Sequence, residues 1–339
     1  MGSESLRISV VVLAYQDEPL LSACVEAILS STGVEIELIL VNNGSPGIES
    51  VADDSRIIKL NPGTNTGFAG GCNLGVAYSS GEVVTFVNSD LVVEPLALFN
   101  LAQRLADPTI GLATGAVVLP GNPVIVNSVG NPTHYLMISW SGSYGDSMSL
   151  HTTSQEVQGI SGALFGVRRE FWDVLGGFDE EYLAYAEDSD LSLRTWQSGK
   201  RVFYESTAVG VHHYDFGRSN QKWYLLERNR VINFLTLYNL RSTFLLFPMF
   251  LVVELGIFFG AARSGWWRQK VKACIWVLAN IPYLRKRRKR IAKAKGRNTG
   301  WAAKLAPSID IPAKFGLSVP TFVNRVLRFY WSLIHRFID

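Results

Sequence analysis

Short apolar runs that alternate with helix-like stretches fill the first 90 residues, and this alternation constrains the fold more than any other feature. Each run is rich in Val, Ile and Leu and is continuous, which is typical of parallel strands covered on both faces. The strand-like runs are Ile8 to Leu13, Ile36 to Val41, Ile57 to Leu60 and Val83 to Val87, and the helix-like stretches are Leu20 to Leu29 and Ala69 to Tyr78. This order predicts an α/β fold with a mixed, mostly parallel central sheet.

Polar residues follow three of these strands, at the point where each strand ends. They are Ala14 to Asp17, Asn42 to Ser45, and the triplet Asn88-Ser89-Asp90. Ligands of such sheets bind beyond the carboxyl ends of the strands. We therefore expect one nucleotide-binding site at this edge of the sheet.

The triplet ending at Asp90 offers one carboxylate and one amide. Mg²⁺ takes one or two protein carboxylates together with phosphate oxygens, so Asp90 is a candidate ligand for a cation that bridges a nucleotide's phosphates. The alternative is a turn capped by Asn and Asp, which is common.

A second acidic group, Glu187-Asp188-Ser189-Asp190, begins a helix predicted over Asp188 to Gln197. The helix dipole stabilises acidic residues in a first turn, which is the structural alternative. The same dipole favours an ionised carboxylate, as a general base needs when it removes a proton from a hydroxyl.

Two further features carry candidate site residues. His212-His213 ends a strand expected over Ala208 to His212, after one over Arg201 to Tyr204, and His212 is either a metal ligand or a structural histidine. The glycine-rich turn Asn65 to Asn73 opens a helix and would let the backbone approach a nucleotide. Residues 118 to 160 lack periodicity, and we expect loops and irregular strands that shape a substrate pocket.

Charge is divided unevenly along the chain. Residues 1 to 240 hold 13 basic and 26 acidic residues, whereas residues 241 to 339 hold 19 basic and 3 acidic ones. An acidic body with a basic, apolar tail indicates work on an anionic surface, either nucleic acid or anionic lipid. The three cysteines lie far apart, which argues against a disulfide framework or a zinc cluster and favours a reducing compartment. We expect no signal peptide at the N-terminus.

The segment Ser242 to Ala262 is apolar apart from Glu254 and is long enough to cross a bilayer. A crossing would place the 18 Lys and Arg residues from Arg263 onward opposite the body, against the positive-inside tendency. We therefore favour a re-entrant or in-plane helix, with Pro248 as a possible kink, over a true span. A buried core helix is the remaining alternative.

Basic residues and a second amphipathic pattern follow that segment. Arg285 to Arg290 is six consecutive basic residues, and beside apolar segments such a run favours anionic lipid over nucleic acid. Apolar residues from Val319 to Phe337 follow helical spacing with Arg325, Arg328 and Arg336 on the other side, as in a helix that lies in a headgroup layer or packs on a neighbour.

The order of these motifs resembles that of family-2 glycosyltransferases with the GT-A fold and, among them, a bacterial rhamnosyltransferase-like branch. The resemblance covers roughly residues 6 to 235. Its motifs are Ile8 to Tyr15, Val41-Asn42-Asn43-Gly44-Ser45, Asn65-x-Gly67-Phe68-Ala69-x-Gly71-x-Asn73-x-Gly75, Asn88-Ser89-Asp90, Arg168-Arg169-Glu170-Phe171, Gly176 to Glu180, Glu187-Asp188-x-Asp190-Leu191, His212-x-Tyr214-Asp215-Phe216 and Glu227-Arg228-Asn229-Arg230.

The resemblance implies a role for each candidate residue. Binding of a nucleotide-diphosphate sugar is implied for Ala14, Tyr15, Asn43, Asn65, Gly67, Phe68, Asn73, Asn88 and Ser89, and placement on the acceptor side for Gly162, Ala163 and His213. Asp90 would bind Mg²⁺ or Mn²⁺, with His212 as a further ligand. Asp188 would be the base that deprotonates the acceptor, with Glu187 as the alternative.

By this resemblance, residues 1–235 would be the catalytic domain and residues 236–339 a helical, membrane-associating region. The protein would be an inverting, metal-dependent hexosyltransferase of cell-envelope polysaccharide synthesis, with rhamnose as one candidate sugar. Its partners would be a nucleotide-diphosphate sugar, a glycan or polyprenyl-linked acceptor and an anionic membrane surface, but no nucleic acid. It would be peripheral or monotopic at the cytoplasmic face of the cell membrane. The alternative is a catalytically silent nucleotide-sugar-binding scaffold at the membrane.

Overall fold

The computed structural model describes residues 6–213, 219–296, 300–312 and 319–338. The chain forms two compact units that alternate along the sequence. Unit 1 comprises Met1–Asn131, Ser141–Ala184 and Lys200–Asp215, and unit 2 comprises Pro132–Trp140, Tyr185–Gly199 and Phe216–Asp339. The motif residues Tyr214, Asp215 and Phe216 lie outside the described residues.

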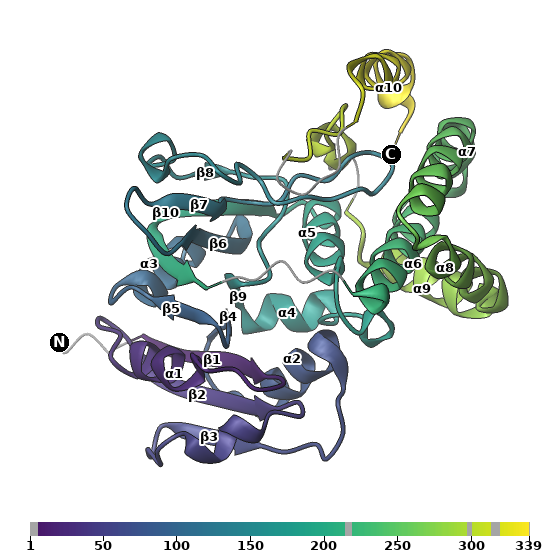
Figure 1. The fold of residues 1–339 in the computed structure, drawn as a ribbon. Coiled ribbons are helices and arrows are strands. Elements are labelled where there is room, and N and C mark those ends of the chain that lie inside the picture. Colours follow the sequence, from purple (N-terminus) through teal and green to yellow (C-terminus); the bar gives the residue numbers. More distant parts are fainter. Residues whose placement is uncertain (1–5, 214–218, 297–299, 313–318, 339) are drawn as a thin grey trace. The chain divides into compact units, whose positions relative to one another are not determined.

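Unit 1 is built on a mixed sheet with helices packed against it (Figure 1). Its strands are β1 (Arg7–Ala14), β2 (Glu35–Asn42), β3 (Ile57–Leu60), β4 (Val83–Asn88), β5 (Leu91–Val93), β6 (Ile110–Leu119), β7 (Ile125–Ser128), β8 (Gln155–Glu156), β9 (Leu164–Arg168) and β10 (Arg201–His212). The strand order is β3-β2-β1-β4-β9-β6-β10-β5, with β7 paired to β6 and β8 paired to β10. The predicted α/β fold with a mixed sheet is confirmed.

Parallel pairing is concentrated in the first strands. β1 pairs in parallel with β2 and β4, and β2 pairs in parallel with β3, as the alternating pattern predicted. β5, β7, β8 and β9 pair antiparallel with their neighbours. β6 and β10 also pair in parallel. The expectation of a mostly parallel sheet is therefore wrong for β5, β7, β8 and β9, because tertiary packing and not a strand's own apolar pattern decides its partner.

Helices on both faces of β1 explain its continuous apolar sequence. Ile8, Val10 and Val12 belong to one core together with buried residues of α1 (Leu21–Leu29) and α3 (Ala97–Leu105). On the other face, the alternate residues Val11 and Leu13 lie against α2 (Gly67–Ala77). Each such buried Val or Leu stabilises the fold by about 1.5–3 kcal/mol relative to exposure.

One long strand stands where two were expected. β10 runs without a break over Arg201–His212, and its pairing with β6 shifts register between Glu205 and Val209. The extra residues form a bulge, which lets one strand continue across a stretch whose sequence pattern is interrupted. Between residues 118 and 160 lie β7, β8 and the 3-10 turn Met148–Leu150, joined by loops, in agreement with the irregular structure expected there.

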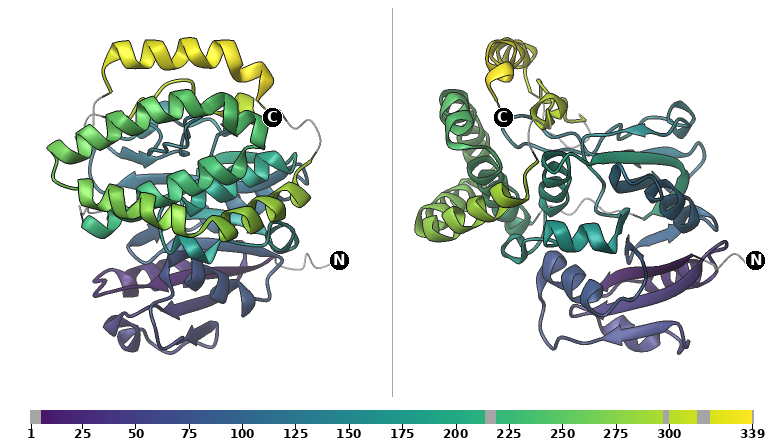
Figure 2. Two further views of the ribbon diagram at one scale, coloured as in Figure 1. Left: turned by 90° about the vertical axis from the view of Figure 1, so that its right-hand side faces the viewer. Right: turned by 180° about the vertical axis from the view of Figure 1, so that it is seen from behind.

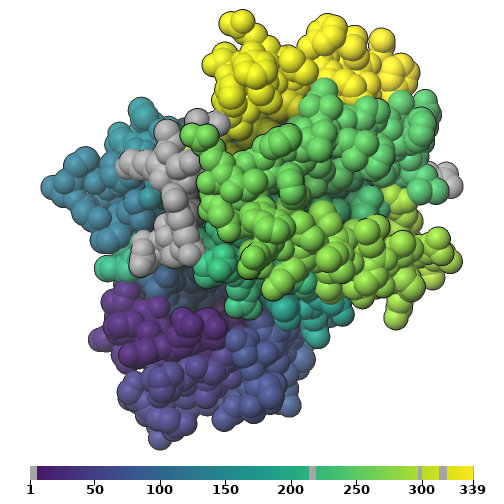
Figure 3. Space-filling model, turned by 45° about the vertical axis from the view of Figure 1, so that its right-hand side comes forward, coloured from purple at the N-terminus to yellow at the C-terminus, as the bar shows by residue number. Residues whose placement is uncertain are grey.

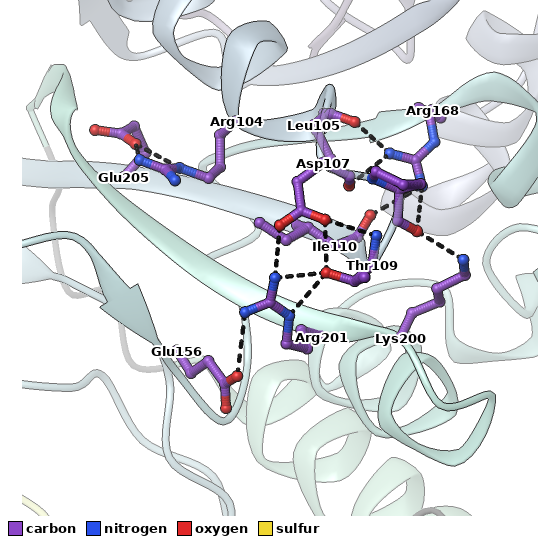
Figure 4. Close-up of polar contacts among 11 residues, drawn as sticks. Arg104, Leu105, Asp107, Thr109, Ile110, Glu156, Arg168, Lys200, Arg201 and Glu205 are labelled. Atoms are coloured by element: carbon purple, nitrogen blue, oxygen red, sulfur yellow. Dashed lines mark hydrogen bonds and ion pairs between the residues drawn. The ribbon is translucent and has the colours of Figure 1, made fainter.

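A polar cluster joins the ends of α3, β6, β9 and β10 (Figure 4). Arg168 donates hydrogen bonds to the carbonyl oxygens of Leu105 and Ile110, and Arg201 forms an ion pair of 2.6 Å with Asp107. The neighbouring Arg169 donates to the carbonyl oxygen of Ser79. The Arg168-Arg169 motif therefore satisfies backbone carbonyls in the body of unit 1, which is a structural role.

Unit 2 is helical. Its helices are α5 (Glu187–Gln197), α6 (Asn220–Leu237), α7 (Leu240–Arg263), α8 (Trp267–Ala279), α9 (Ile281–Ala294) and α10 (Thr321–Ile334). The side chain of Asn239 caps α7 by accepting a hydrogen bond of 2.8 Å from the backbone N–H of Ser242, and Pro248 lies inside that helix. Among the described residues, α7 is the one helix long and apolar enough to cross a membrane, which is weak support for a membrane-associated region.

Candidate active site

The carboxyl ends of β1, β2 and β4 lie next to one another in unit 1. Ala14 is in register with Asn42, and Leu13 is in register with Asn88, because β1 lies between the two other strands and is parallel to both. The structure therefore brings together the three polar strand ends that the sequence singled out. Tyr15, directly after β1, is 47% exposed at this edge.

Asn43 is buried at this edge and holds the glycine-rich turn. Its Oδ1 accepts a hydrogen bond of 2.7 Å from the backbone N–H of Thr66, and its Nδ2 donates to Oδ1 of Asn65 at 2.9 Å. Asn65 Oδ1 also accepts a bond of 2.8 Å from the N–H of Gly67. These contacts fix the turn beside the end of β2.

The rest of the turn packs against the segment that follows α4 (Arg169–Leu175). Gly67 has a φ of +73°, and a Cβ there would lie 2.6 Å from the carbonyl oxygen of Leu183. Asn73 donates to the carbonyl oxygen of Phe178 and accepts from its N–H, each at 3.0 Å, and the ring of Phe68 lies 5.9 Å from that of Phe178. The small residues of the turn thus allow close packing inside unit 1. Contact between this turn and a nucleotide stays a prediction.

The side chains of Asp90 and His212 form a hydrogen-bonded pair at this edge of the sheet. His212 Nε2 lies 3.0 Å from Asp90 Oδ1, because β5 and the end of β10 pair antiparallel. His212 Nδ1 lies 3.2 Å from Oδ1 of Asn127, at the end of β7. The imidazole of His212 thus lies between two oxygen atoms, which fix the orientation of its ring.

This pair fits a divalent cation that takes its other ligands from a substrate. One carboxylate and one oriented imidazole are present, and Mg²⁺ characteristically keeps few protein ligands beside phosphate oxygens and water. Within the described ranges, no group of three or more His, Cys, Asp or Glu residues could hold an ion by itself. A metal at Asp90 and His212 would therefore need further ligands from the phosphates of a bound nucleotide.

The residues predicted for the acceptor side border the same triplet. The carbonyl oxygen of Ala163 accepts a hydrogen bond of 3.0 Å from the N–H of Asn88, and the N–H of His213 donates to the carbonyl oxygen of Asp90 at 3.0 Å. Gly162 precedes Ala163 at the start of β9, and His213 is exposed. Ser89 is half-buried between Asn88 and Asp90. The acceptor-side roles of Gly162, Ala163 and His213 stay predictions.

In unit 2, the acidic group begins α5 at Glu187, one residue earlier than predicted. The two residues before it, Tyr185 and Ala186, both have left-handed φ values, of 70° and 65°. Such conformations are costly for residues other than glycine and gather at functional sites. The carbonyl oxygen of Tyr185 accepts a hydrogen bond of 2.7 Å from Asn229 of α6, which helps to hold this backbone.

The two candidate bases differ in their surroundings. Glu187 is buried, and among the described residues its Oε2 has no hydrogen-bond partner. Burial, together with the charges of Asp188 and Asp190, raises its pKa well above the ordinary value. Asp188 is half-exposed, and its Oδ1 accepts a hydrogen bond of 2.7 Å from the N–H of Ser189 at the start of α5. The helix N-terminus favours a negative charge there, so Asp188 is the better placed base.

Asp190 has a structural role that the sequence left open. Its two oxygens bind Arg194, at 2.9 Å, and Arg287 of α9, and both Asp190 and Arg287 are almost fully buried. Burial by itself would raise the pKa of Asp190, but Arg194 and Arg287 hold it below the usual value. Arg287 belongs to the basic run that was expected to face lipid, and for this residue the expectation is wrong.

Two partners were missed by sequence reasoning. Asn127 lies in the region without periodicity, and nothing in its neighbourhood distinguishes it from a loop residue. Arg287 was hidden among five other basic residues, although it is spaced three and four residues from the apolar Leu284 and Ile291, which are also buried on α9. That spacing was the available signal.

The fold and the site define an α/β protein whose candidate site lies at the carboxyl edge of a mixed sheet. Residues 9–175 match the family described as glycosyl transferase family 2. The O-antigen biosynthesis protein RfbC of Myxococcus xanthus is 27% identical over 216 residues, which are 60% of this chain and 17% of that protein. The glycosyltransferase GlyG of Streptococcus pneumoniae is 32% identical over 114 residues, which are 32% of this chain and 38% of that protein. The chain spans well under half the length of these relatives.

Solved structures support the fold. The structure of GalNAc-T7 with UDP, GalNAc and Mn²⁺ has a TM-score of 0.52 and 15% sequence identity, and the match covers 65% of this chain and 48% of that one. At this identity the likeness concerns the fold alone.

Proposed function

We propose that the protein is a family-2 glycosyltransferase that moves a sugar from a nucleotide-diphosphate sugar to a hydroxyl of an acceptor. The observation that carries the proposal is the Asp90–His212 pair, oriented by Asn127, at the edge where the polar ends of β1, β2 and β4 meet. A carboxylate and an imidazole can hold a divalent cation that also binds the phosphates of a nucleotide sugar. A neutral ligand would offer no such phosphates.

On the donor side, Tyr15 and the polar strand ends would contact the base and ribose, while Asn43 and Asn65 hold the turn in place beside them. Asp90 and His212 would hold Mg²⁺ or Mn²⁺. When bound, the metal would neutralise the negative charge that develops on the departing diphosphate.

On the acceptor side, Asp188 would remove the proton from the attacking hydroxyl. The hydroxyl oxygen would form the new bond to the anomeric carbon while the bond from that carbon to the diphosphate oxygen breaks. A single in-line displacement of this kind inverts the anomeric centre. Glu187 is less suited to this step because burial raises its pKa, and a carboxyl group must be ionised to act as a base.

The setting proposed for this reaction is the synthesis of a cell-envelope polysaccharide on a glycan or polyprenyl-linked acceptor, with rhamnose as one candidate sugar. The name of the relative RfbC, an O-antigen biosynthesis protein, and the basic, apolar C-terminal segment support this setting. We place the protein at the cytoplasmic face of a membrane, with residues 1–235 as the catalytic part and residues 236–339 as the membrane-associating part.

The test is sugar transfer by full-length protein carrying Asp188→Asn. We expect the turnover rate to fall by about 100-fold or more, because a general base contributes roughly 10²–10⁴-fold. Binding of the donor should remain. Asp173→Asn, which removes an exposed carboxylate of α4, is the matched control and should retain full activity. NMR of the product's anomeric proton reports inversion.

Full activity of the Asp188→Asn variant would overturn the assigned base. Donor binding without transfer to any acceptor, by the unmodified protein, would instead favour the nucleotide-sugar-binding scaffold.

A further inference from the structure

The helices α7, α8 and α10 of unit 2 leave large apolar side chains exposed on their outer sides. On α7 these residues recur every three or four positions, so they form one stripe along the helix. Among the most exposed are Leu240, Phe244 and Phe259 on α7, Leu278 on α8, and Phe322 and Phe329 on α10. Figure 2 (left) shows α7, α10 and the α8–α9 pair running across one face of unit 2, and Figure 3 shows their side chains, in green and yellow, as one continuous surface.

The opposite side of α7 faces protein. Ser242, Leu246, Met249 and Phe250 are buried there, and the ring of Phe250 stacks on Phe234 of α6 at 4.0 Å between ring centres. The helix is therefore apolar and exposed on one side only. A helix that crosses a bilayer by itself must face lipid on all sides, whereas one that lies in the interface has this one-sided pattern.

The single acidic residue of α7, Glu254, lies on the protein-facing side in a cluster of four charged side chains. It binds Arg230 of α6 and Lys270 of α8, and both of these cations also bind Glu227 of α6. The side chains of Arg230 and Lys270 are 5% and 4% exposed. Burial by itself would raise the pKa of Glu227, but Arg230 and Lys270 lower it to about 2, so Glu227 stays charged.

This cluster opposes a transmembrane position for α7. Glu254 is nine residues, or about 14 Å, from the end of the helix, so in a spanning helix it would lie within the hydrocarbon core. Arg230, Lys270 and Glu227 would have to enter the core with it, and with them α6, which buries Arg228, Asn229 and Asn233. Burying so many polar groups in lipid is far more costly than leaving them in the interface.

We infer that α7, α8 and α10 lie in the plane of the membrane and insert their exposed apolar side chains into a single leaflet that contains anionic lipid. The charge of this region favours an anionic lipid leaflet over a second copy of the chain as the partner of these helices. Residues 241 to 339 hold 19 basic and 3 acidic residues, so two such faces would repel each other, while an anionic leaflet attracts them. Exposed cations border the face on the same helices, among them Arg268, Lys272, Arg325 and Arg328. The inference rests on the membrane location proposed above and is independent of sugar transfer.

The deciding experiment asks whether both ends of α7 lie on one side of a membrane. In full-length protein carrying Cys274→Ala, which removes the exposed cysteine of α8, a single cysteine is introduced by Arg241→Cys or by Ser264→Cys. Inner-membrane vesicles with the cytoplasmic side outward are treated with a membrane-impermeant maleimide. We expect both cysteines to react without detergent. Protection of one of them until detergent is added would show that α7 spans the bilayer and would overturn the inference.

A second measurement tests the leaflet contact with purified protein. The protein is floated with phosphatidylcholine vesicles that either contain or lack phosphatidylglycerol, and the bound fraction is measured. We expect stronger binding to the anionic vesicles and a loss of about 10-fold or more for the double variant Phe244→Ser, Phe259→Ser. The matched control, Tyr78→Ser with Leu150→Ser, removes two exposed apolar side chains of unit 1 and should bind like the unmodified protein.

Equal binding by the face variant and the control would overturn the leaflet contact. So would a stable dimer in lipid-free solution that the face variant abolishes, or binding to RNA in place of anionic vesicles. If the face variant does not fold, the cysteine labelling still decides the orientation. A protein that passes both tests but transfers no sugar would contradict the proposed function and leave this inference standing.

Discussion

His134 is a fully buried imidazole in unit 2, and its surroundings make stability depend on pH. Its Nδ1 accepts a hydrogen bond of 3.1 Å from the N–H of Leu136, and burial lowers its pKa from the usual 6.5 to about 3. The neutral ring is thus favoured in the folded chain, whereas the unfolded chain binds a proton near pH 6.5. This contribution to stability is complete above pH 6.5 and is lost as the pH falls toward 3.

We predict that His134 lowers the free energy of unfolding by about 2 kcal/mol between pH 7 and pH 5, from 1.36 kcal/mol per pKa unit. Urea unfolding at the two pH values measures this change. His134→Gln should be less stable at pH 7 but should lose less stability on acidification. His335→Gln, which removes an exposed imidazole, is the control. Equal pH dependence in the unmodified protein and the His134 variant would contradict the prediction.

At the scale of elements, Arg287 joins α9 to the helix that carries the proposed base. Arg287→Met would leave the buried Asp190 with its ion pair to Arg194 and would remove the hydrogen bond to Thr236 of α6. Breaking a buried ion pair by removing one partner costs about 3–5 kcal/mol. We therefore expect a loss of this size in the free energy of unfolding, measured by urea titration.

Arg285→Met is the matched control for Arg287, since it removes an exposed cation from the same basic run. We expect its stability to stay within about 0.5 kcal/mol of the unmodified protein, as for most surface substitutions. If both variants lost the same stability, the loss would come from the charge of the run and not from the contact with Asp190.

Close packing of α2 on β1 gives a second prediction at this scale. A Cβ at Gly75 would lie 2.4 Å from Cγ1 of Val11, a branched side chain with little freedom to move inside the core. We expect Gly75→Ala to destabilise the fold by about 1–3 kcal/mol. Gly256→Ala on α7, where a Cβ meets nothing within 4 Å, should be neutral or stabilising by up to about 1 kcal/mol. Thermal unfolding compares the pair, and a stabilising Gly75→Ala would contradict the packing argument.

At the scale of the whole molecule, ligand binding should raise the free energy of unfolding. A nucleotide-diphosphate sugar at 100 times its dissociation constant would add about 2.7 kcal/mol to the free energy of unfolding. We expect this gain to require Mn²⁺ or Mg²⁺, to disappear with EDTA, and to be lost in Asp90→Ala. Thermal unfolding with a panel of donors measures it and identifies the nucleobase.

The chain offers a matched control for Asp90. Asp146 and His151 form another carboxylate–imidazole pair, also 3.0 Å apart, with the Asp146 side chain 48% exposed. Asp146→Ala should keep the metal-dependent gain, because this pair lies in the segment between β7 and β8 and not at the carboxyl ends of β1 and β4. A gain that persisted in Asp90→Ala would remove Asp90 as the metal ligand.

The sequence by itself determined the first strands and the edge that they share. Continuous apolar runs indicate strands that are buried on both faces. The carboxyl ends of parallel neighbours lie at the same edge of a sheet, so Ala14, Asn42 and Asn88 could be grouped from the sequence. The helix that begins at the acidic group was also predictable, because its acidic start and the glycine after its end are local signals.

Only the tertiary structure decided the contacts between residues far apart in the chain. Asp190 and Arg287 are 97 positions apart, His212 and Asn127 are 85 apart, and each pair depends on how several elements pack together. The one-sided burial of α7 is of the same kind, since its sequence is apolar nearly all round and the partner of Glu254 on α6 is 24 residues away. Local propensity cannot encode such choices, because the free energy that selects them comes from burial and charge pairing in the assembled fold.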